Sequence, residues 1–282
     1  MNVVNDFTFA RSKTSPKRKK LIMRKFIDVF YGIEYSQLFP LCKKVGFDGF
    51  FSGEIYANHP NELEKIEQLA HAHDLLWETS HSTIPQSQTI WSDGEEGDAY
   101  CKILLANINN CKQFHVPLLV VHISPNFSKK PSFELGIQRL ESVVEYAKKV
   151  GVKIAFENIN SAEYLFDTLA HFDDLHVGFC YDCGHEACHT PNVRYLPKIG
   201  NRLFCTHLHD NDRKGDCHWL PFDGSIDFEK ICQELKNCNY QGNLTLELCY
   251  NDDYRNKYTQ EQFIQEAYFR VERLRAMIQC KG

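Results

Sequence analysis

The chain has 282 residues, of which 43 % are apolar and 24 % charged, a composition typical of a globular protein with a sizeable core. Its net charge of −5 argues against a surface that coats nucleic acid, and no apolar run is long enough to predict a membrane span. The 12 cysteines are scattered, without a pair of CxxC motifs, and no secretory signal precedes them. We therefore expect reduced thiols in a cytoplasmic enzyme.

Residues 1–22 are polar and basic and show no hydrophobic period. They predict a disordered leader, with Met23 as an alternative start and a nucleic-acid-binding arm as the alternative role. The segment is too hydrophilic for a secretory signal. Residues 23–282 are expected to form a single domain, because no stretch of low complexity divides them.

From Lys25 onward, short apolar runs alternate with longer amphipathic segments. The apolar runs predict eight strands, at residues 26–31, 48–53, 75–80, 118–123, 153–157, 177–182, 203–208 and 244–249. The amphipathic segments predict eight helices, at residues 35–45, 61–73, 98–115, 133–149, 162–170, 192–199, 227–237 and 259–278. Ser132 and Asp227 stand where helices should begin, and Gly46 and Gly151 where helices should end.

Eight strands that alternate with eight helices predict an α/β protein, a (β/α)8 TIM barrel. The run from Val116 to Val121 is continuously apolar, as expected for a parallel strand buried on both faces. A doubly wound sheet is the main competitor. The first predicted strand–helix turn, Tyr31-Gly-Ile-Glu-Tyr, lacks the glycine-rich phosphate fingerprint of that fold, so we favour the barrel.

Groups that can bind a cation stand at the ends of six predicted strands. The stretch from His207, at the end of the seventh strand, to His218 in the following loop holds three His and three Asp within twelve residues. Because the carboxyl ends of barrel strands meet on one face, these groups should converge there. The residues at the six strand ends are His81, His122, Glu157, Asp182, His207 and Glu247.

Clustered carboxylates repel one another and are costly to desolvate without a cation, so the pattern predicts a metal site. A mixture of imidazole and carboxylate ligands suits Zn²⁺, Mn²⁺ or Fe²⁺. Cys183 and Cys217 fall at predicted turn positions between better candidates, so thiolate ligands are not expected.

The combination of Glu157-x-x-Asn160, Asp182-x-x-His185, His207-x-x-Asp210 and Glu247 resembles the xylose isomerase-like TIM barrel superfamily. That superfamily contains the sugar phosphate isomerase/epimerase family and, as a sister branch, endonuclease IV. In the epimerase branch, the resemblance implies one divalent ion, Mn²⁺ or Zn²⁺, with Co²⁺, Fe²⁺ or Mg²⁺ as alternatives. Its ligands would be Glu157, Asp182, His207 and Glu247, and His185 would contact substrate.

In the endonuclease IV branch, the resemblance implies three zinc ions. The additional ligands would then be His81, His122, His185, Asp216 and His218, and all of these residue types are present. The segment from Asp216 to Asp227 looks more like the epimerase branch, and the acidic net charge disfavours binding to a phosphate backbone. We therefore expect an enzyme that acts on a small sugar or sugar phosphate rather than on nucleic acid.

The favoured reaction is isomerisation or epimerisation through a metal-stabilised enediolate, with Glu157 and Glu247 moving the proton and His185 binding an oxygen of the substrate. The alternatives are an endonuclease IV-like zinc phosphodiesterase, an inosose-type dehydratase and a non-catalytic metal-binding protein. Barrels of this kind often pair, so a homo-oligomer is one expectation.

Other residues receive supporting roles. His209 is expected beside a ligand, and Asp210 is expected to orient a ligand imidazole. Candidates for the substrate wall are Phe51, Glu54 and Trp91, and basic residues on loops of the same face are Lys129, Lys130 and Arg213.

Overall fold

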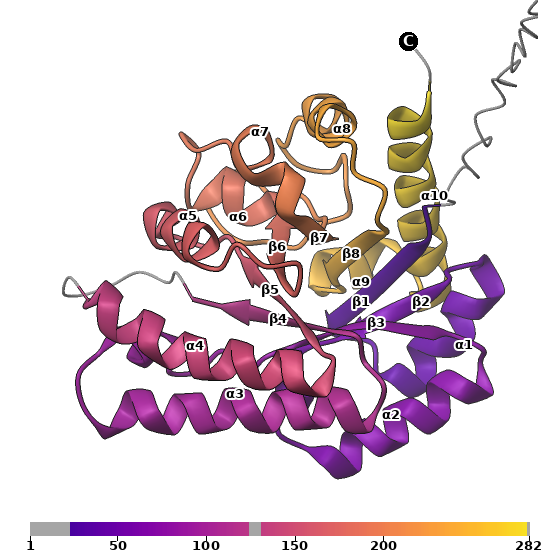
Figure 1. Ribbon diagram of the computed structural model, residues 1–282. Coiled ribbons are helices and arrows are strands. Elements are labelled where there is room, and N and C mark those ends of the chain that lie inside the picture. The colour runs from indigo at the N-terminus through magenta and orange to yellow at the C-terminus, as the bar shows by residue number, and fades with distance from the viewer. Residues whose placement is uncertain (1–22, 124–130, 281–282) are drawn as a thin grey trace, which may run out of the picture.

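Eight parallel strands form the centre of the computed structural model, which describes residues 23–123 and 131–280 (Figure 1). Each strand pairs with the next along the chain from β1 to β7, and β8 returns to pair with β1. The strands are β1 Lys25–Tyr31, β2 Gly49–Ser52, β3 Leu76–His81, β4 Leu118–His122, β5 Lys153–Glu157, β6 Val177–Asp182, β7 Leu203–His207 and β8 Leu244–Cys249.

The ring closes between β7 and β8 through one bridge, whereas every other pair of neighbouring strands shares at least two register pairs. Leu208, just beyond β7, forms a single parallel bridge with Leu246, and its backbone N–H donates to the Thr245 carbonyl at 2.9 Å. The nearly closed parallel ring confirms the predicted (β/α)8 barrel.

Helices surround this ring, and Figure 1 shows α3 and α4 running side by side along it. The helices are α1 Tyr35–Val45, α2 Pro60–Ala72, α3 Glu95–Gln113, α4 Phe133–Val150, α5 Ala162–His171, α6 Cys183–Cys188, α7 Leu196–Ile199, α8 Phe228–Asn237, α9 Asp252–Lys257 and α10 Gln260–Gln279. Short 3₁₀ turns lie at η1 Glu54–Tyr56, η2 Ser87–Trp91 and η3 Gly200–Arg202.

The predicted helix ends are confirmed by local geometry. Ser132 accepts a hydrogen bond from the Leu135 backbone N–H, and Asp227 accepts one from Lys230. Gly46 and Gly151 end their helices at φ of 103° and 82°, a left-handed conformation that glycine adopts without strain.

The region after β6 differs from prediction. The helix expected at 192–199 shrinks to α7, whereas α6 starts directly after the strand, at Cys183. The reason is a local cap: the Asp182 carboxylate accepts a hydrogen bond from the His185 backbone N–H at 2.6 Å. The sequence prediction also missed α9, which Asn251 caps by accepting from Tyr254 N–H at 3.1 Å.

Side chains on the two faces of the strands build two cores. The outer faces pack against the helices, whereas the inner faces form a small core inside the barrel from Leu118, Val120, Ala155, Cys180 and Cys205. Side chains alternate between the two faces along each strand, so the inward-facing positions continue to the carboxyl ends of the strands. There the inward-facing residues are polar.

Two further sequence predictions concern the basic leader and membrane-spanning helices. The predicted leader at residues 1–22 lies outside the described residues. Among the helices of the described ranges, none combines the length and apolarity needed to cross a bilayer.

Candidate metal centre and pocket

The inward-facing side chains at the carboxyl ends of the strands form one polar layer. Strand register explains their convergence, because residues paired across adjacent strands point to the same side of the sheet. The register pairs are His122 with Glu157, Asp182 with His207, and Asp28 with Glu247.

At the centre of this layer lie the four predicted metal ligands, Glu157, Asp182, His207 and Glu247. Each offers a ligand atom within 4.8 Å of those of the other three. The imidazole Nδ1 of His207 is 3.2 Å from Glu157 Oε1 and 3.5 Å from Glu247 Oε2, so the two glutamates flank the same ring. We call these four residues the central cluster.

The electrostatics of the central cluster fit a divalent cation. Burial raises the pKa of Glu247 well above its usual range, and the neighbouring carboxylates of Glu157 and Asp182 raise it further. Burial also opposes ionisation of Glu157, but the imidazoles of His207 and His122 outweigh this effect and hold its pKa well below its usual range. The Nε2 atom of His207 is buried without a partner. A cation would relieve the repulsion between these carboxylates.

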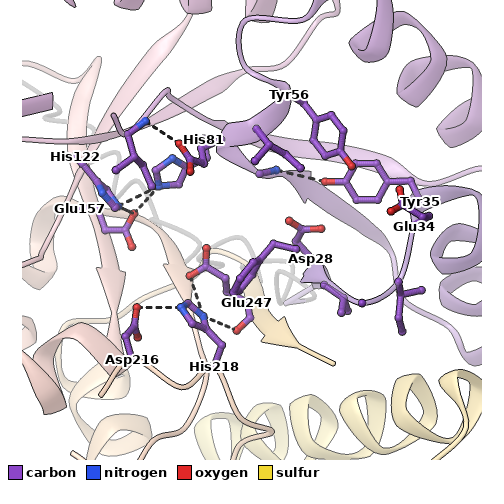
Figure 2. Close-up of a pocket in the computed structure, with 18 of the residues that line it drawn as sticks. Asp28, Glu34, Tyr35, Tyr56, His81, His122, Glu157, Asp216, His218 and Glu247 are labelled. Carbon is purple, nitrogen blue, oxygen red and sulfur yellow. Dashed lines mark hydrogen bonds and ion pairs between the residues drawn. The ribbon is translucent and has the colours of Figure 1, made fainter. Parts of the chain in front are cut away.

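A second group shares Glu157 with the central cluster. The Nε2 atoms of His81 and His122 lie 3.2 Å and 3.1 Å from Glu157 Oε2 (Figure 2). Cys180 also comes near Glu157 and His207, but burial raises its pKa well above its usual range and favours the neutral thiol.

A third group surrounds Asp216 at the edge of the site. Its Oδ2 is 3.1 Å from His185 Nε2 and 3.0 Å from His218 Nε2. His189 also comes close enough to join them, a residue that sequence reasoning missed. The structure thus brings the predicted ligand candidates together in three adjoining groups: Glu157, Asp182, His207 and Glu247; His81 and His122 beside Glu157; and His185 and His218 around Asp216.

Several neighbours hold these side chains in place. His209 Nε2 lies 3.2 Å from Asp182 Oδ2, and the His209 ring stacks on His218 at 4.0 Å, so it does lie beside a candidate ligand. Any side chain at Gly184 would collide with the His209 ring, so this close approach requires glycine. Phe51, predicted as substrate wall, stacks on His207 at 4.6 Å instead.

The role predicted for Asp210 was wrong. Its buried carboxylate contacts no ligand imidazole but accepts hydrogen bonds from four backbone N–H groups of its own loop. The donors are Asn211 at 2.8 Å, Phe222 at 3.0 Å, Gly224 at 2.9 Å and Ile226 at 3.0 Å. Asp210 therefore fixes the loop that carries Asp216 and His218.

We expect Asp210→Ala to lower the free energy of unfolding by about 3–5 kcal/mol, because four amide donors lose their acceptor. Urea denaturation measures this change. Asp212→Ala is the matched control: Asp212 accepts from two amides of a more exposed turn and should cost less than about 1 kcal/mol. Equal stability of the two variants would contradict the role of Asp210.

A cavity of about 240 Å³ opens onto the three groups. This size lies just below the usual range for small-molecule sites, about 300–1,000 Å³. Glu54 lines it, as predicted, and accepts a hydrogen bond from Ile84 N–H at 2.9 Å. Trp91 does not line it, because its ring is buried in the core and donates to the Ile123 carbonyl at 2.6 Å.

Of the basic residues proposed for this face, Arg213 is not among the residues that line the pocket. Arg213 lines a separate hollow beside Arg194 and donates to the Ser225 carbonyl at 3.3 Å. Lys129 and Lys130 lie outside the described residues.

Asp28 is a pocket residue that sequence reasoning missed. It lies on β1 beside Glu247, is fully buried, and neither carboxylate oxygen has a hydrogen-bond partner. Burial raises its pKa to about 7. The Tyr35 hydroxyl lies close enough to oppose this rise but donates to the Phe51 carbonyl at 3.3 Å. The sequence offered one signal for Asp28, a single acidic residue within the apolar run of the first strand.

Comparisons with known proteins agree with this architecture. The family model described as xylose isomerase-like TIM barrel matches residues 39–267, so the chain belongs to that family. Protein y4fM of Sinorhizobium fredii is 33% identical over 122 residues, which cover 41% of this chain and 39% of that protein. The fructoselysine 3-epimerase of Escherichia coli O157:H7 is 23% identical over 120 residues, covering 39% of this chain and 44% of the epimerase.

A solved structure extends the likeness to nearly the whole chain. D-psicose 3-epimerase from Clostridium cellulolyticum H10 superposes with a TM-score of 0.75 at 14% identity, covering 92% of this chain and 100% of that one. At this identity the likeness shows the fold alone. The alignments with the two curated relatives span less than half of their length.

Proposed function

We propose that this protein is a divalent-metal-dependent sugar isomerase or epimerase that moves a proton on the carbon next to a carbonyl group. The observation that carries the proposal is the central cluster, in which two glutamates flank one imidazole at the end of a small pocket. Relatives named as sugar epimerases support it. The metal ligands would be Glu157, Asp182, His207 and Glu247.

The two glutamates are suited to proton transfer. They come from β5 and β8, so they approach His207 from different strands and can face opposite sides of one substrate carbon. One would remove the proton, and the other would return a proton to the opposite face or to the neighbouring carbon. A bound divalent ion would act as a Lewis acid that polarises the substrate carbonyl.

His185 would bind the carbonyl oxygen or the adjacent hydroxyl. Its Nδ1 faces the Asn158 carbonyl at 2.9 Å, which fixes the ring and leaves Nε2 directed toward Asp216 and the pocket. The Asn158 side chain also bridges to the Asp182 backbone, at 2.8 Å and 2.9 Å. Substrate binding and metal binding would thus share one rigid support.

The direct test is exchange of the substrate α-proton with solvent. The purified protein, supplied with Mn²⁺ or Zn²⁺, would be incubated in D₂O with a panel of ketoses and their phosphate esters and followed by NMR. Deuterium at the carbon next to the carbonyl, with or without an epimeric product, is expected. Loss of water from the substrate would indicate a dehydratase, and absence of exchange with every sugar would refute the proposal.

A second candidate is phosphoester hydrolysis by a multinuclear zinc centre. The specific observation in its favour is that the second and third groups adjoin the central cluster and supply further imidazole and carboxylate ligands. Paired metal ions of this kind can clamp the attacking and leaving oxygens of a phosphoester. Hydrolysis of bis-p-nitrophenyl phosphate or of abasic-site DNA without sugar exchange would establish this candidate instead.

A further inference from the structure

One part of the pocket is lined by the β1–α1 loop and by η1 rather than by the central cluster, and we call this part the side chamber. We define it by Ile33, Glu34, Tyr35, Glu54, Ile55 and Tyr56. Figure 2 shows Asp28 between this chamber, marked by Tyr35 and Glu34, and Glu247 of the central cluster. A ligand that reaches from the metal ligands into the chamber must therefore pass Asp28.

The charged side chains that line the side chamber, and Asp28 beside it, are all acidic. Asp28, Glu34 and Glu54 face the pocket, and among the described residues that line it there is neither Lys nor Arg. Arg255 approaches Gly32 at the pocket edge, but it is paired with Asp252 at 3.0 Å and lies over the Tyr31 ring. A phosphate group in this chamber would meet carboxylates without a described cation to bind it.

Asp28 gives a second reason to expect a ligand in this pocket, independent of the acidic charge of the side chamber. A buried carboxylate without a donor is destabilising, so its retention at this position needs another explanation. Both oxygens lack partners, and no dashed contact reaches them in Figure 2. Hydroxyl groups of a ligand would supply the missing donors and form strong, charge-assisted hydrogen bonds.

We propose that the substrate is an unphosphorylated sugar, and that Asp28 binds it by accepting hydrogen bonds from its hydroxyl groups. This inference rests on the proposed function and narrows its substrate class. Asp28 pairs in register with Glu247, so the hydroxyls that it binds lie next to the reacting carbon. Asp28 is thus a specificity-determining residue, while the aromatic rings of Tyr35 and Tyr56 form the apolar wall of the chamber.

The test measures binding separately from turnover. Isothermal titration calorimetry of the metal-loaded protein would use D-fructose, D-tagatose and D-ribulose, each beside its terminal phosphate ester. At least one free sugar should bind tenfold or more tightly than its ester. Asp28→Asn should weaken that binding by about 10–100-fold, the usual effect of losing hydrogen bonds to a charged group.

Glu78→Gln is the matched control. Glu78 is an inward-facing carboxylate at the other end of the barrel, but both its oxygens are already hydrogen-bonded, to Asn243 at 2.6 Å and Thr245 at 2.5 Å. This variant should leave sugar affinity unchanged and lower the Tm. Asp28→Asn should instead raise the Tm by about 2–4 °C or more, because it removes an unpaired buried charge.

The outcomes separate this inference from the proposed function. Preferred binding of a free sugar through Asp28 without proton exchange would support the inference and refute the epimerase. Proton exchange observed only with phosphate esters would support the proposed function and refute the inference that the substrate is unphosphorylated. The inference is overturned if esters bind as tightly as free sugars, if no free sugar binds, or if Asp28→Asn behaves like Glu78→Gln.

Discussion

Replacing Glu247 by glutamine should reduce kcat for α-proton exchange by about 10²–10⁴-fold, because the amide cannot accept or return the proton. Glu157→Gln should have an effect at least as large, since Glu157 also contacts His81, His122 and His207. The measurement is solvent deuterium exchange at saturating metal, with metal content determined on the same samples. That second determination separates lost proton transfer from lost metal.

The control for this pair is again Glu78→Gln, which changes an inward-facing carboxylate that is hydrogen-bonded to Asn243 and Thr245 and is not one of the four residues of the central cluster. Its kcat should stay within a factor of two or three of the parent. Parental exchange rates in either Glu157→Gln or Glu247→Gln would show that the two glutamates do not carry the proton.

Removal of the metal by a chelator should abolish exchange and lower the Tm. A ligand present at a thousand times its Kd stabilises a fold by about 4 kcal/mol, which corresponds to roughly 8–16 °C for a chain of this size. Differential scanning calorimetry before and after chelation, followed by addition of Mn²⁺ or Zn²⁺, checks this. An unchanged Tm would mean that the central cluster does not hold a metal ion.

Metal stoichiometry decides between the two candidate functions. Elemental analysis should find about one divalent ion per chain under the epimerase proposal and three zinc ions under the phosphoesterase alternative. His218→Ala tests the same distinction, because His218 pairs with Asp216 of the third group and is not one of the four proposed ligands, although its Nδ1 lies 3.7 Å from Glu247 Oε2. The variant should keep most exchange activity with one ion bound, and a complete loss would favour the multinuclear centre.

The sequence predicted the barrel well because its signals are local and repeated. Each strand is a short apolar run, and each polar end residue stands at a fixed phase of the side-chain alternation, as at Glu157 and His207. Once eight repeats were recognised, barrel topology alone placed the ligands together. Glu157, Asp182, His207 and Glu247 therefore meet as expected.

The features that were missed depend on long-range or single contacts. Asp210 looked like a partner for an imidazole, because no sequence pattern reveals that four amides between residues 211 and 226 fold back onto it. The short α6 depends on the cap from Asp182, a residue already assigned to the metal. Asp28 gave only one weak signal, since its lack of partners is a property of the folded pocket.

The closure of the ring has a consequence for the order in which the site can assemble. Glu247 reaches its neighbours only when β8 docks on β1, a pairing between strands more than 200 residues apart, and when the single bridge at Leu208 forms. Contacts of such sequence separation form slowly. During synthesis, Glu157, Asp182 and His207 would therefore emerge well before Glu247, and a complete four-ligand site would mark the end of folding rather than nucleate it.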